Sequence, residues 1–455
     1  MIYLTGLIWG ITEVTYLTVI CVVGFVITLL IIPYIIKLMK KKGYIGYDIH
    51  KNARPEVAES GGLSIVIGIS ITSILLMVFF PALLKEIFVY FLTVVISGLI
   101  GFIDDRVKLR SLYKIILTIF TGSALFLANY FGFITILSPT IPFLGVTRLT
   151  MIYPLVIPLI VAVFANASNM LEGYNGEGSG TSLIALGFLF ICALLGNSAE
   201  ALLISTTAMA VLIPFFLYNK YPSKVFPGDI GTLSLGAVFA CIALLGSLEV
   251  AVFCVLLTHI INSFYVLRSV KGFIESSELQ QNQNDIILLE NDRIKASNQR
   301  DSALSLPRLI LAKGSLTEPE LVKQFYVISI ICGFFSIIAV TFIDWTLGNL
   351  NIIYIILLIV IFSIPVIFLL YKFPRVRGIV MLMILLLTVI SLILIFIDLI
   401  VIQFFPGSFI IFQIEIPYNI IFSFILIIPS LAVWYYITIK YFWMQINSMK
   451  NSEGI

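Results

Sequence analysis

Charged residues are scarce in this chain of 455 residues, since Asp, Glu, Lys and Arg make up only 11% of it. A soluble globular protein carries about 25%, so the composition excludes that class, because too little polar surface would face water. Cysteine occurs five times, at Cys21, Cys192, Cys241, Cys254 and Cys332. These cysteines show no metal-ligand spacing and are most simply apolar packing residues. A net charge of +3 is too small to indicate nucleic-acid binding.

Apolar residues, in contrast, fill 60% of the chain, and the mean hydropathy is +1.12. Stretches of about 20 apolar residues recur along nearly the whole length, and each could cross a hydrocarbon core of roughly 30 Å as a helix. We therefore predict an all-α polytopic membrane protein. The thirteen predicted spans are 15–38, 61–81, 86–103, 114–131, 151–165, 180–196, 201–218, 231–248, 250–267, 326–343, 351–371, 379–397 and 419–439.

The positions of the cations predict the orientation, because loops rich in Lys and Arg stay in the cytoplasm. When the loop with Lys40, Lys41 and Lys42 is placed inside, strict alternation puts all but two of the 27 Lys and Arg on that side; the exceptions are Lys85 and Arg148. The N-terminus is then outside and the C-terminus inside. The first residues lack a basic region and a cleavage site, so we expect the first helix to be retained as an anchor.

Two adjacent carboxylates, Asp104 and Asp105, follow the apolar run 87–103 and precede a basic stretch that includes Lys108 and Lys114. Unpaired charge near the hydrocarbon is costly, so a charged cluster at a membrane boundary predicts a functional site. We expect this cluster to bind something polar.

The segment 166–180 combines three asparagines, Asn166, Asn169 and Asn175, with several glycines and contains no basic residue. Amides offer neutral donors and acceptors, and glycine allows close backbone approach, which suits a phosphate, a metal ion or the edge of a nucleobase. The structural alternative is an ordinary glycine-rich loop between two helices.

Two further polar positions also have structural alternatives. Asp229 lies between glycines just before the span 231–248, where a lone Asp is normally an Asx-turn or a helix N-cap. It becomes a Mg²⁺ candidate only beside a phosphate-bearing substrate, because Mg²⁺ takes one or two carboxylates together with phosphate oxygens. The segment 48–62 mixes both charges, and by itself it is typical of a solvated cytoplasmic loop.

Four segments in this order resemble the polyprenyl-phosphate N-acetylhexosamine-1-phosphate transferases. They are Glu-Ser-Gly-Gly at 59–62, Phe-Ile-Asp-Asp-Arg-Val-Lys-Leu-Arg at 102–110, Asn-Ala-Ser-Asn with Gly-Tyr-Asn-Gly at 166–176, and Val-Phe-Pro-Gly-Asp at 225–229. The resemblance covers about residues 15–343 and implies that residues 1–343 form a ten-helix transferase core. The active-site loops of this core are expected in the cytoplasm, and the largest of them is 268–325. Three spans exceed that core, and we interpret 344–455 as accessory transmembrane helices.

Within this family the chain is more similar to the archaeal and eukaryotic dolichol branch. Gly173-Tyr-Asn175-Gly176 is similar to the Gly-x-Asn-Gly form of the N-glycosylation enzymes, where bacterial relatives have Asp-Gly-x-Asp-Gly, and the histidine run of the muramoyl enzymes is absent. The His and Arg cluster that the branch places before Pro307-Arg308 is replaced by Ala303-Leu304-Ser305. Arg300 and Arg308 are therefore our candidates for clasping the sugar and the diphosphate.

The resemblance implies transfer of GlcNAc-1-phosphate from UDP-GlcNAc to dolichyl or another polyprenyl phosphate, with release of UMP, as the first membrane step of lipid-linked oligosaccharide assembly for protein N-glycosylation. It implies Mg²⁺ as the cofactor, with Mn²⁺ as the other ion to consider. Asp104 and Asp105 are expected to position the attacking lipid phosphate. The residues carried over by motif are Asp104, Asp105 and Lys114 as catalytic groups, Asp229 and Asn169 as metal ligands, and Glu59, Lys108, Asn166, Asn169, Asn175, Arg300 and Arg308 as substrate contacts, with Asn175 and Glu59 at the uridine.

Three alternatives remain open from the sequence. The same chemistry could use another UDP-N-acetylhexosamine or a muramoyl donor in cell-envelope synthesis. A transporter would also be polytopic, but it should carry its polar residues near the midplane in paired broken helices. An inactive membrane scaffold would have no reason to retain acids, amides and cations on one face. We expect a multi-pass protein of an archaeal cell membrane or of the endoplasmic reticulum, with a cytoplasmic active site, and a homodimer is open.

Overall fold

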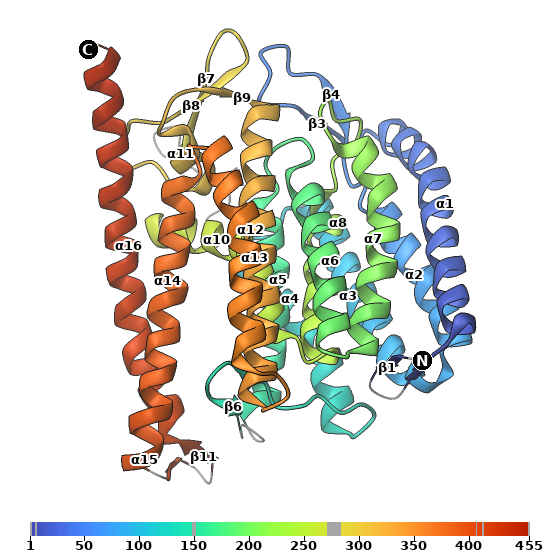
Figure 1. Cartoon of the computed structure of the whole chain (residues 1–455). Helices are drawn as coiled ribbons and strands as arrows, with labels where there is room; N and C mark the ends of the chain where they lie inside the picture. The colour runs from blue at the N-terminus through green and yellow to red at the C-terminus, as the bar shows by residue number, and fades with distance from the viewer. Residues whose placement is uncertain are drawn as a thin grey trace.

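The computed structural model describes residues 2–4, 7–147, 152–270, 284–405, 407–411 and 414–453. Arg148, one of the two cations predicted to lie outside, falls beyond the described residues. Long helices run side by side through the molecule, and the two chain ends lie at opposite ends of the bundle, as an odd number of crossings requires (Figure 1).

The helices account for every predicted span. Within the described ranges, eleven are long and apolar enough to cross a membrane, the bent pair α9 and α10 makes a twelfth, and α2 is an apolar helix of 17 residues. The all-α polytopic fold is therefore confirmed. The helices are α1 (Ile11–Lys41), α2 (Leu63–Phe79), α3 (Leu84–Val107), α4 (Ser111–Tyr130), α5 (Ile152–Leu171), α6 (Glu177–Leu195), α7 (Ala199–Asn219), α8 (Gly228–Leu245), α9 (Glu249–Val255), α10 (Leu257–Ser269), α11 (Leu306–Leu311), α12 (Glu318–Thr346), α13 (Ile352–Lys372), α14 (Arg377–Phe396), α15 (Ile402–Phe404) and α16 (Tyr418–Glu453).

Within the described residues, short strands pair in the segment before α1 and in the connections between helices. The first loop contains the antiparallel hairpin of β3 (Ile45–Tyr47) and β4 (Glu56–Ala58). The long loop before α12 contains a sheet of three strands in the order β7-β8-β9. The remaining elements are β1 (Ile2–Leu4), β2 (Leu7–Trp9), β5 (Thr140–Ile141), β6 (Gly145–Val146), β7 (Ile286–Leu288), β8 (Arg293–Ala296), β9 (Leu316–Thr317), β10 (Ser408–Ile411), β11 (Ile414–Pro417) and the short helical turns η1 (Pro81–Leu83) and η3 (Ile397–Val401).

Helix α8 forms the centre of the bundle. It packs against α3 and α5, and every residue from Ile230 to Leu244 is buried. A helix that is apolar on all sides is expected in the core of a large protein or a membrane bundle. Small residues allow close packing, since a Cβ on Gly236 would come within 2.3 Å of the Cα of Ala165 on α5. The N-terminus of α8, and Asp229 with it, is thereby fixed between neighbouring helices.

Two helix boundaries differ from the prediction and change the setting of the candidate residues. Helix α5 continues to Leu171 instead of ending at 165, and α8 begins at Gly228 instead of 231. Asn166, Asn169 and Asp229 therefore lie on helices, not in loops. Nδ2 of Asn166 donates to Thr118 on α4 and also to the carbonyl oxygen of Ala162 one turn earlier, and Oδ1 of Asn169 accepts from Thr232 on α8.

The predicted span 250–267 is divided into two helices in the structure. Helices α9 and α10 meet there at an angle of 69°. Leu256 between them has φ −91° and ψ 10°, outside the α-helical region, so the bend arises at that residue. Beyond the bend, Asn262 of α10 donates to the carbonyl oxygen of Met170 near the end of α5.

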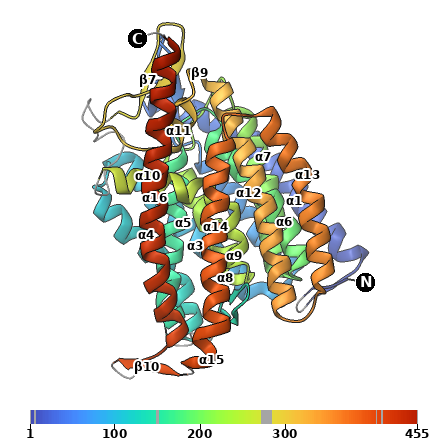
Figure 2. The same ribbon diagram turned by 60° about the vertical axis from the view of Figure 1, so that its left-hand side comes forward.

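The last helices share a hydrophobic core with the long loop. Buried side chains of α14 and α16 join those of α10, α11, α12 and strand β8 in one cluster, separate from the main core of the bundle. Figure 2 shows α14 and α16 standing beside α10 and α12. The accessory segment predicted for 344–455 therefore contacts the rest of the chain through a continuous apolar interior.

Candidate functional site

Three charged side chains from three helices meet at one end of the bundle. Nζ of Lys114 on α4 lies 2.6 Å from Oδ2 of Asp104 on α3 and 3.0 Å from Oδ2 of Asp229 on α8. The side chains of Asp104 and Lys114 are buried, whereas that of Asp229 is 24% exposed. Oδ1 of Asp104 accepts the N–H of Leu109, which fixes the connection from α3 to α4. One cation thus contacts two carboxylates, and Asp229 is the member of this triad that is open to a ligand.

Asp105 makes different contacts from its neighbour. Its Oδ1 accepts the backbone N–H of Asp229 at 2.7 Å, and its Oδ2 accepts the hydroxyl of Ser60 at 2.7 Å. The first N–H groups of a helix have no partner within the helix, and a carboxylate there also favours the helix dipole. Asp105 therefore holds the first turn of α8 and the segment before α2 in place.

Two glycines allow the helices to converge behind Asp229. A Cβ on Gly62 would lie 2.2 Å from the Cα of Gly231 on α8. A Cβ on Gly101 of α3 would lie 2.4 Å from the carbonyl oxygen of Asp229. Without a side chain at these positions α2 and α3 can approach the backbone of α8. Gly62, which closes the Glu-Ser-Gly-Gly motif, thus has a packing role beside the triad.

Two asparagines at the end of α5 bond to helices on either side. Nδ2 of Asn166 donates to Oγ1 of Thr118 on α4 at 2.8 Å. Oδ1 of Asn169 accepts from Oγ1 of Thr232 on α8 at 2.7 Å. Thr232 lies one turn after Asp229, so the amide of Asn169 is held beside the first turn of α8.

Asp229 and Asn169 together offer a donor set for a hard divalent cation. Mg²⁺ takes oxygen ligands and in phosphate sites is bound by one or two carboxylates plus substrate oxygens. The Asp229 carboxylate is partly exposed, and the amide oxygen of Asn169 reaches the same end of α8. The residues therefore fit Mg²⁺ or Mn²⁺ in the presence of a substrate phosphate.

A second polar cluster surrounds Asn175, in the turn between α5 and α6. Its Nδ2 donates to Oδ2 of Asp48 at 2.8 Å and to Oε2 of Glu318 at 3.3 Å, and its backbone N–H donates to Oε1 of Glu318 at 2.7 Å. Nζ of Lys51 lies 2.5 Å from Oδ2 of Asp48. The cluster joins the first loop to the start of α12 through the turn that contains Asn175.

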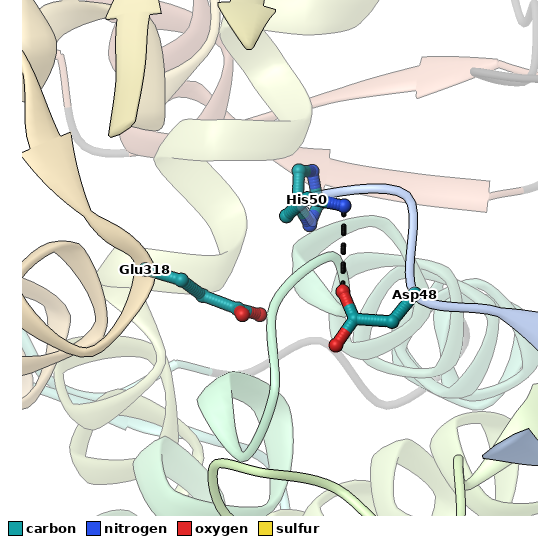
Figure 3. A group of neighbouring side chains, drawn as sticks. All are labelled: Asp48, His50 and Glu318. Carbon is teal, nitrogen blue, oxygen red and sulfur yellow. Dashed lines mark hydrogen bonds between the residues drawn. The ribbon is translucent and has the colours of Figure 1, made fainter. Parts of the chain in front are cut away.

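Asp48, His50 and Glu318 present ligand atoms within 4.8 Å of one another, and Figure 3 shows the three side chains converging. Protein groups already contact both carboxylates, since Lys51 pairs with Asp48 and Asn175 donates to each. His50 stacks on Tyr174 with 4.3 Å between ring centroids, and burial lowers the pKa of its imidazole to about 4. We interpret this cluster as a framework for the turn.

Buried glutamates shape the same turn. Oε2 of Glu177 accepts the N–H groups of Gly173 and Tyr174, each at 3.2 Å. The Glu172 carboxyl lies against Gly178, where a Cβ would come within 1.9 Å of its Oε2. Burial raises the pKa of Glu172 to about 8, so this side chain is largely protonated at neutral pH.

Several residues that build the site had no assigned role in the sequence. Glu318 begins a helix that hydropathy places at 326, so it resembles an ordinary acid at a helix start. Asp48 and Lys51 carried a weak signal, because they precede the Glu-Ser-Gly-Gly motif in a loop of mixed charge. Thr232 and Glu177 carried none that we identified, since each lies at the start of an apolar helix.

The two candidates for the sugar clasp have different environments. Arg308 is buried, and its guanidinium makes five hydrogen bonds. The acceptors are the carbonyl oxygens of Ser297, which accepts two, and of Gln299, Ser302 and Ala303. An arginine has five N–H donors, so none remains for a phosphate in this arrangement. Arg300 lies on the same loop and is exposed.

Two other predicted substrate contacts, Lys108 and Glu59, lie in connections between helices. Lys108 is exposed at the end of α3, where its φ of +50° marks the left-handed turn that leads to α4. Glu59 follows β4 and lies over Gly46 of β3, where a Cβ would come within 2.5 Å of its Oε1.

Comparison with known proteins adds to this geometry. Residues 87–247 match glycosyl transferase family 4, and that stretch contains Asp104, Lys114 and Asp229. A Sulfolobus acidocaldarius protein is 34% identical over 259 residues, which cover 55% of this chain and 77% of the relative. The chain belongs to glycosyl transferase family 4.

Relatives with two kinds of name are found in this family. The S. acidocaldarius protein is provisionally named UDP-N-acetylglucosamine–dolichyl-phosphate N-acetylglucosaminephosphotransferase, as is one from Saccharolobus solfataricus that is 31% identical over 54% of this chain and 76% of its own length. A phospho-N-acetylmuramoyl-pentapeptide-transferase of Latilactobacillus sakei is 29% identical over 55% of this chain and 82% of its own length. Family membership confirms the resemblance seen in the four motifs and makes this chain a membrane transferase.

Proposed function

We propose that this chain transfers GlcNAc-1-phosphate from UDP-GlcNAc to a polyprenyl phosphate, with dolichyl phosphate as the expected lipid, and releases UMP. The observation that carries the proposal is the triad of Asp104, Lys114 and Asp229, with Asn169 beside it, at one end of a membrane bundle. The names of the two archaeal relatives support this choice of donor and acceptor.

The reaction needs charge neutralisation and positioning more than proton transfer. An oxygen of the lipid phosphate attacks the β-phosphorus of UDP-GlcNAc and forms a new P–O bond. The bond from that phosphorus to the oxygen bridging to UMP breaks, and UMP leaves with the oxygen and its electron pair. A phosphate monoester has its second pKa near 6, so the attacking oxygen is already largely ionised at neutral pH. The protein then has to align the groups and stabilise the negative charge that develops.

Each member of the triad has a role in that scheme. The Lys114 ammonium neutralises phosphate oxygens, and Asp104 keeps it aimed at Asp229. Asp229 and Asn169 would hold Mg²⁺, which when bound supplies a compact positive charge for the diphosphate. Asp105 acts through α8, because its carboxylate bonds to the backbone of Asp229. We therefore assign Asp105 as a positioning residue, in place of direct contact with the lipid phosphate.

We assign the uridine to the segment 46–48 of the first loop. Gly46, beneath Glu59, and Asp48, bonded to Asn175, are two residues apart in the chain. Glu59 and Asn175 therefore flank the same short segment. Glu59 offers carboxylate oxygens and Asn175 an amide oxygen, and these atoms can accept from the N–H groups of a nucleobase edge. Asn166 on α5 and Lys108 at the end of α3 are proposed as further substrate contacts.

The cytoplasm is proposed as the side of the reaction. The loop after α1 and the connection from α3 to α4 carry most of the nearby Lys and Arg, and such loops remain cytoplasmic. UDP-sugars are soluble, and the lipid phosphate sits at the membrane surface, so a site at the end of the bundle can reach both.

A donor comparison tests the proposal. Purified protein with Mg²⁺ and dolichyl phosphate is offered UDP-GlcNAc, UDP-GalNAc or UDP-N-acetylmuramoyl-pentapeptide, and UMP release is measured for each. We expect release with UDP-GlcNAc. Release with the muramoyl donor alone would establish the second candidate, which the L. sakei relative favours. Absence of release with all three donors, from folded protein, would overturn both.

A further inference from the structure

Helix α16 brings aromatic side chains to the end of the bundle that carries the site. Trp434 donates through Nε1 to the carbonyl oxygen of Leu382 on α14 at 2.8 Å and stacks on Tyr265 of α10, with centroids 5.3 Å apart and planes 18° apart. Two turns later, the ring centroid of Phe442 lies 4.6 Å from Cζ of Arg308. Trp434 and Phe442 are 4% and 1% exposed. A helix that served only as a lipid anchor would have no need for these buried contacts.

Arg308 links Phe442 to the loop 297–303 and orders that loop. The edge of its guanidinium gathers the carbonyl oxygens of 297–303, while its face rests on Phe442. Cation–π contact is strongest where water is excluded, and both side chains are buried. Arg300, the exposed arginine of this loop, is thus held by a network that ends on α16.

Trp434 is also connected to the end of α5, through Tyr265 and the rest of helix α10. Asn262 precedes Tyr265 by one turn of α10. Its Nδ2 donates to the carbonyl oxygen of Met170 at 3.0 Å, and its Oδ1 accepts the N–H of Leu306 at 2.9 Å. Met170 is the chain neighbour of Asn169, and Leu306 begins α11. Helix α10 therefore ties α16 both to the end of α5 and to the helix that carries Arg308.

We infer that α16 is a positioning element of the transferase site, which holds the loop 297–303 and α10 so that Arg300 and Asn169 can reach the sugar diphosphate. The inference rests on the proposed function for the identity of the substrate. It gives the helices beyond residue 343 a role that the four motifs do not require.

Single substitutions on α16 test this role in the full-length protein. Phe442→Leu keeps an apolar side chain but removes the aromatic ring. Phe442→Tyr, a separate variant, keeps the ring. Met444→Leu is the matched control, because Met444 is on the same helix and is 60% exposed. The measurements are KM and kcat for UDP-GlcNAc, and amide hydrogen exchange at 297–303.

We expect Phe442→Leu to raise KM about two- to thirtyfold, because that is the range of affinity to which the free energy of one cation–π contact corresponds. The value of kcat should change less. Amide exchange should become faster only in the loop 297–303 and in α11. Phe442→Tyr and Met444→Leu should each keep the KM and the exchange rate of the wild type. Unchanged exchange and KM in Phe442→Leu would overturn the inference, and so would faster exchange spread over α3 to α8, which indicates general destabilisation. If the wild type released no UMP from UDP-GlcNAc, the proposed function would fail, while the exchange result would still decide whether α16 orders the loop.

Discussion

Replacing Lys114 by Met should destabilise the folded protein, because the carboxylates of Asp104 and Asp229 lose their shared cation. The ammonium lies 2.6 Å from one carboxylate and 3.0 Å from the other, and only Asp229 is open to water. Removing one partner of a buried ion pair costs about 3–5 kcal/mol, because a charge is left without compensation. The partial exposure of Asp229 places the expected loss at about 3 kcal/mol, near the lower end of that range. Equilibrium unfolding in mixed micelles with EDTA measures this loss directly.

Added Mg²⁺ should recover more stability in Lys114→Met than in the wild type, because the divalent ion replaces the missing charge and no longer meets a neighbouring ammonium. Binding to the folded state alone stabilises it in proportion to the logarithm of ligand concentration over Kd. Lys108→Met, which removes an exposed cation of the same basic stretch, is the control and should change stability by less than about 0.5 kcal/mol. A Lys114→Met protein as stable as the wild type in EDTA, or equally shifted by Mg²⁺, would refute the charge balance described for the triad.

Three further outcomes are expected. Asp105→Ala should lower the free energy of unfolding by about 0.5–2 kcal/mol, the value of a helix N-cap; an unchanged unfolding midpoint would show that α8 does not depend on it. Asp229→Ala should abolish the thermal stabilisation produced by Mg²⁺, and a variant that still shifts like the wild type would remove Asp229 from the metal site. Because burial raises the pKa of Glu172 to about 8 from 4.5, folding takes up a proton between these values, so stability should fall as pH rises through that window and level off above 8. Glu172→Gln should flatten this profile, and an identical pH dependence in the variant would exclude Glu172 as its cause.

The motif residues could be predicted as a set, but their separate roles could not. Adjacent in the chain, Asp104 and Asp105 look equivalent, yet one pairs with Lys114 and the other caps α8. The difference arises because consecutive residues on a helix point about 100° apart, so they meet different neighbours. For Arg308, the family resemblance predicted a contact with the sugar diphosphate, and the structure shows that its guanidinium bonds to carbonyl oxygens of its own loop.

Hydropathy by itself determined which segments become helices and cross the membrane, because the transfer of an apolar run into hydrocarbon depends on its local composition. Four short motifs and their order likewise predicted the family. Only the tertiary structure decided that Lys114 meets a carboxylate 115 residues away, that Asn175 joins the first loop to α12, and that α16 lies over Arg308. Such contacts depend on how helices pack, and a linear pattern of polar and apolar residues does not specify which distant side chains face one another.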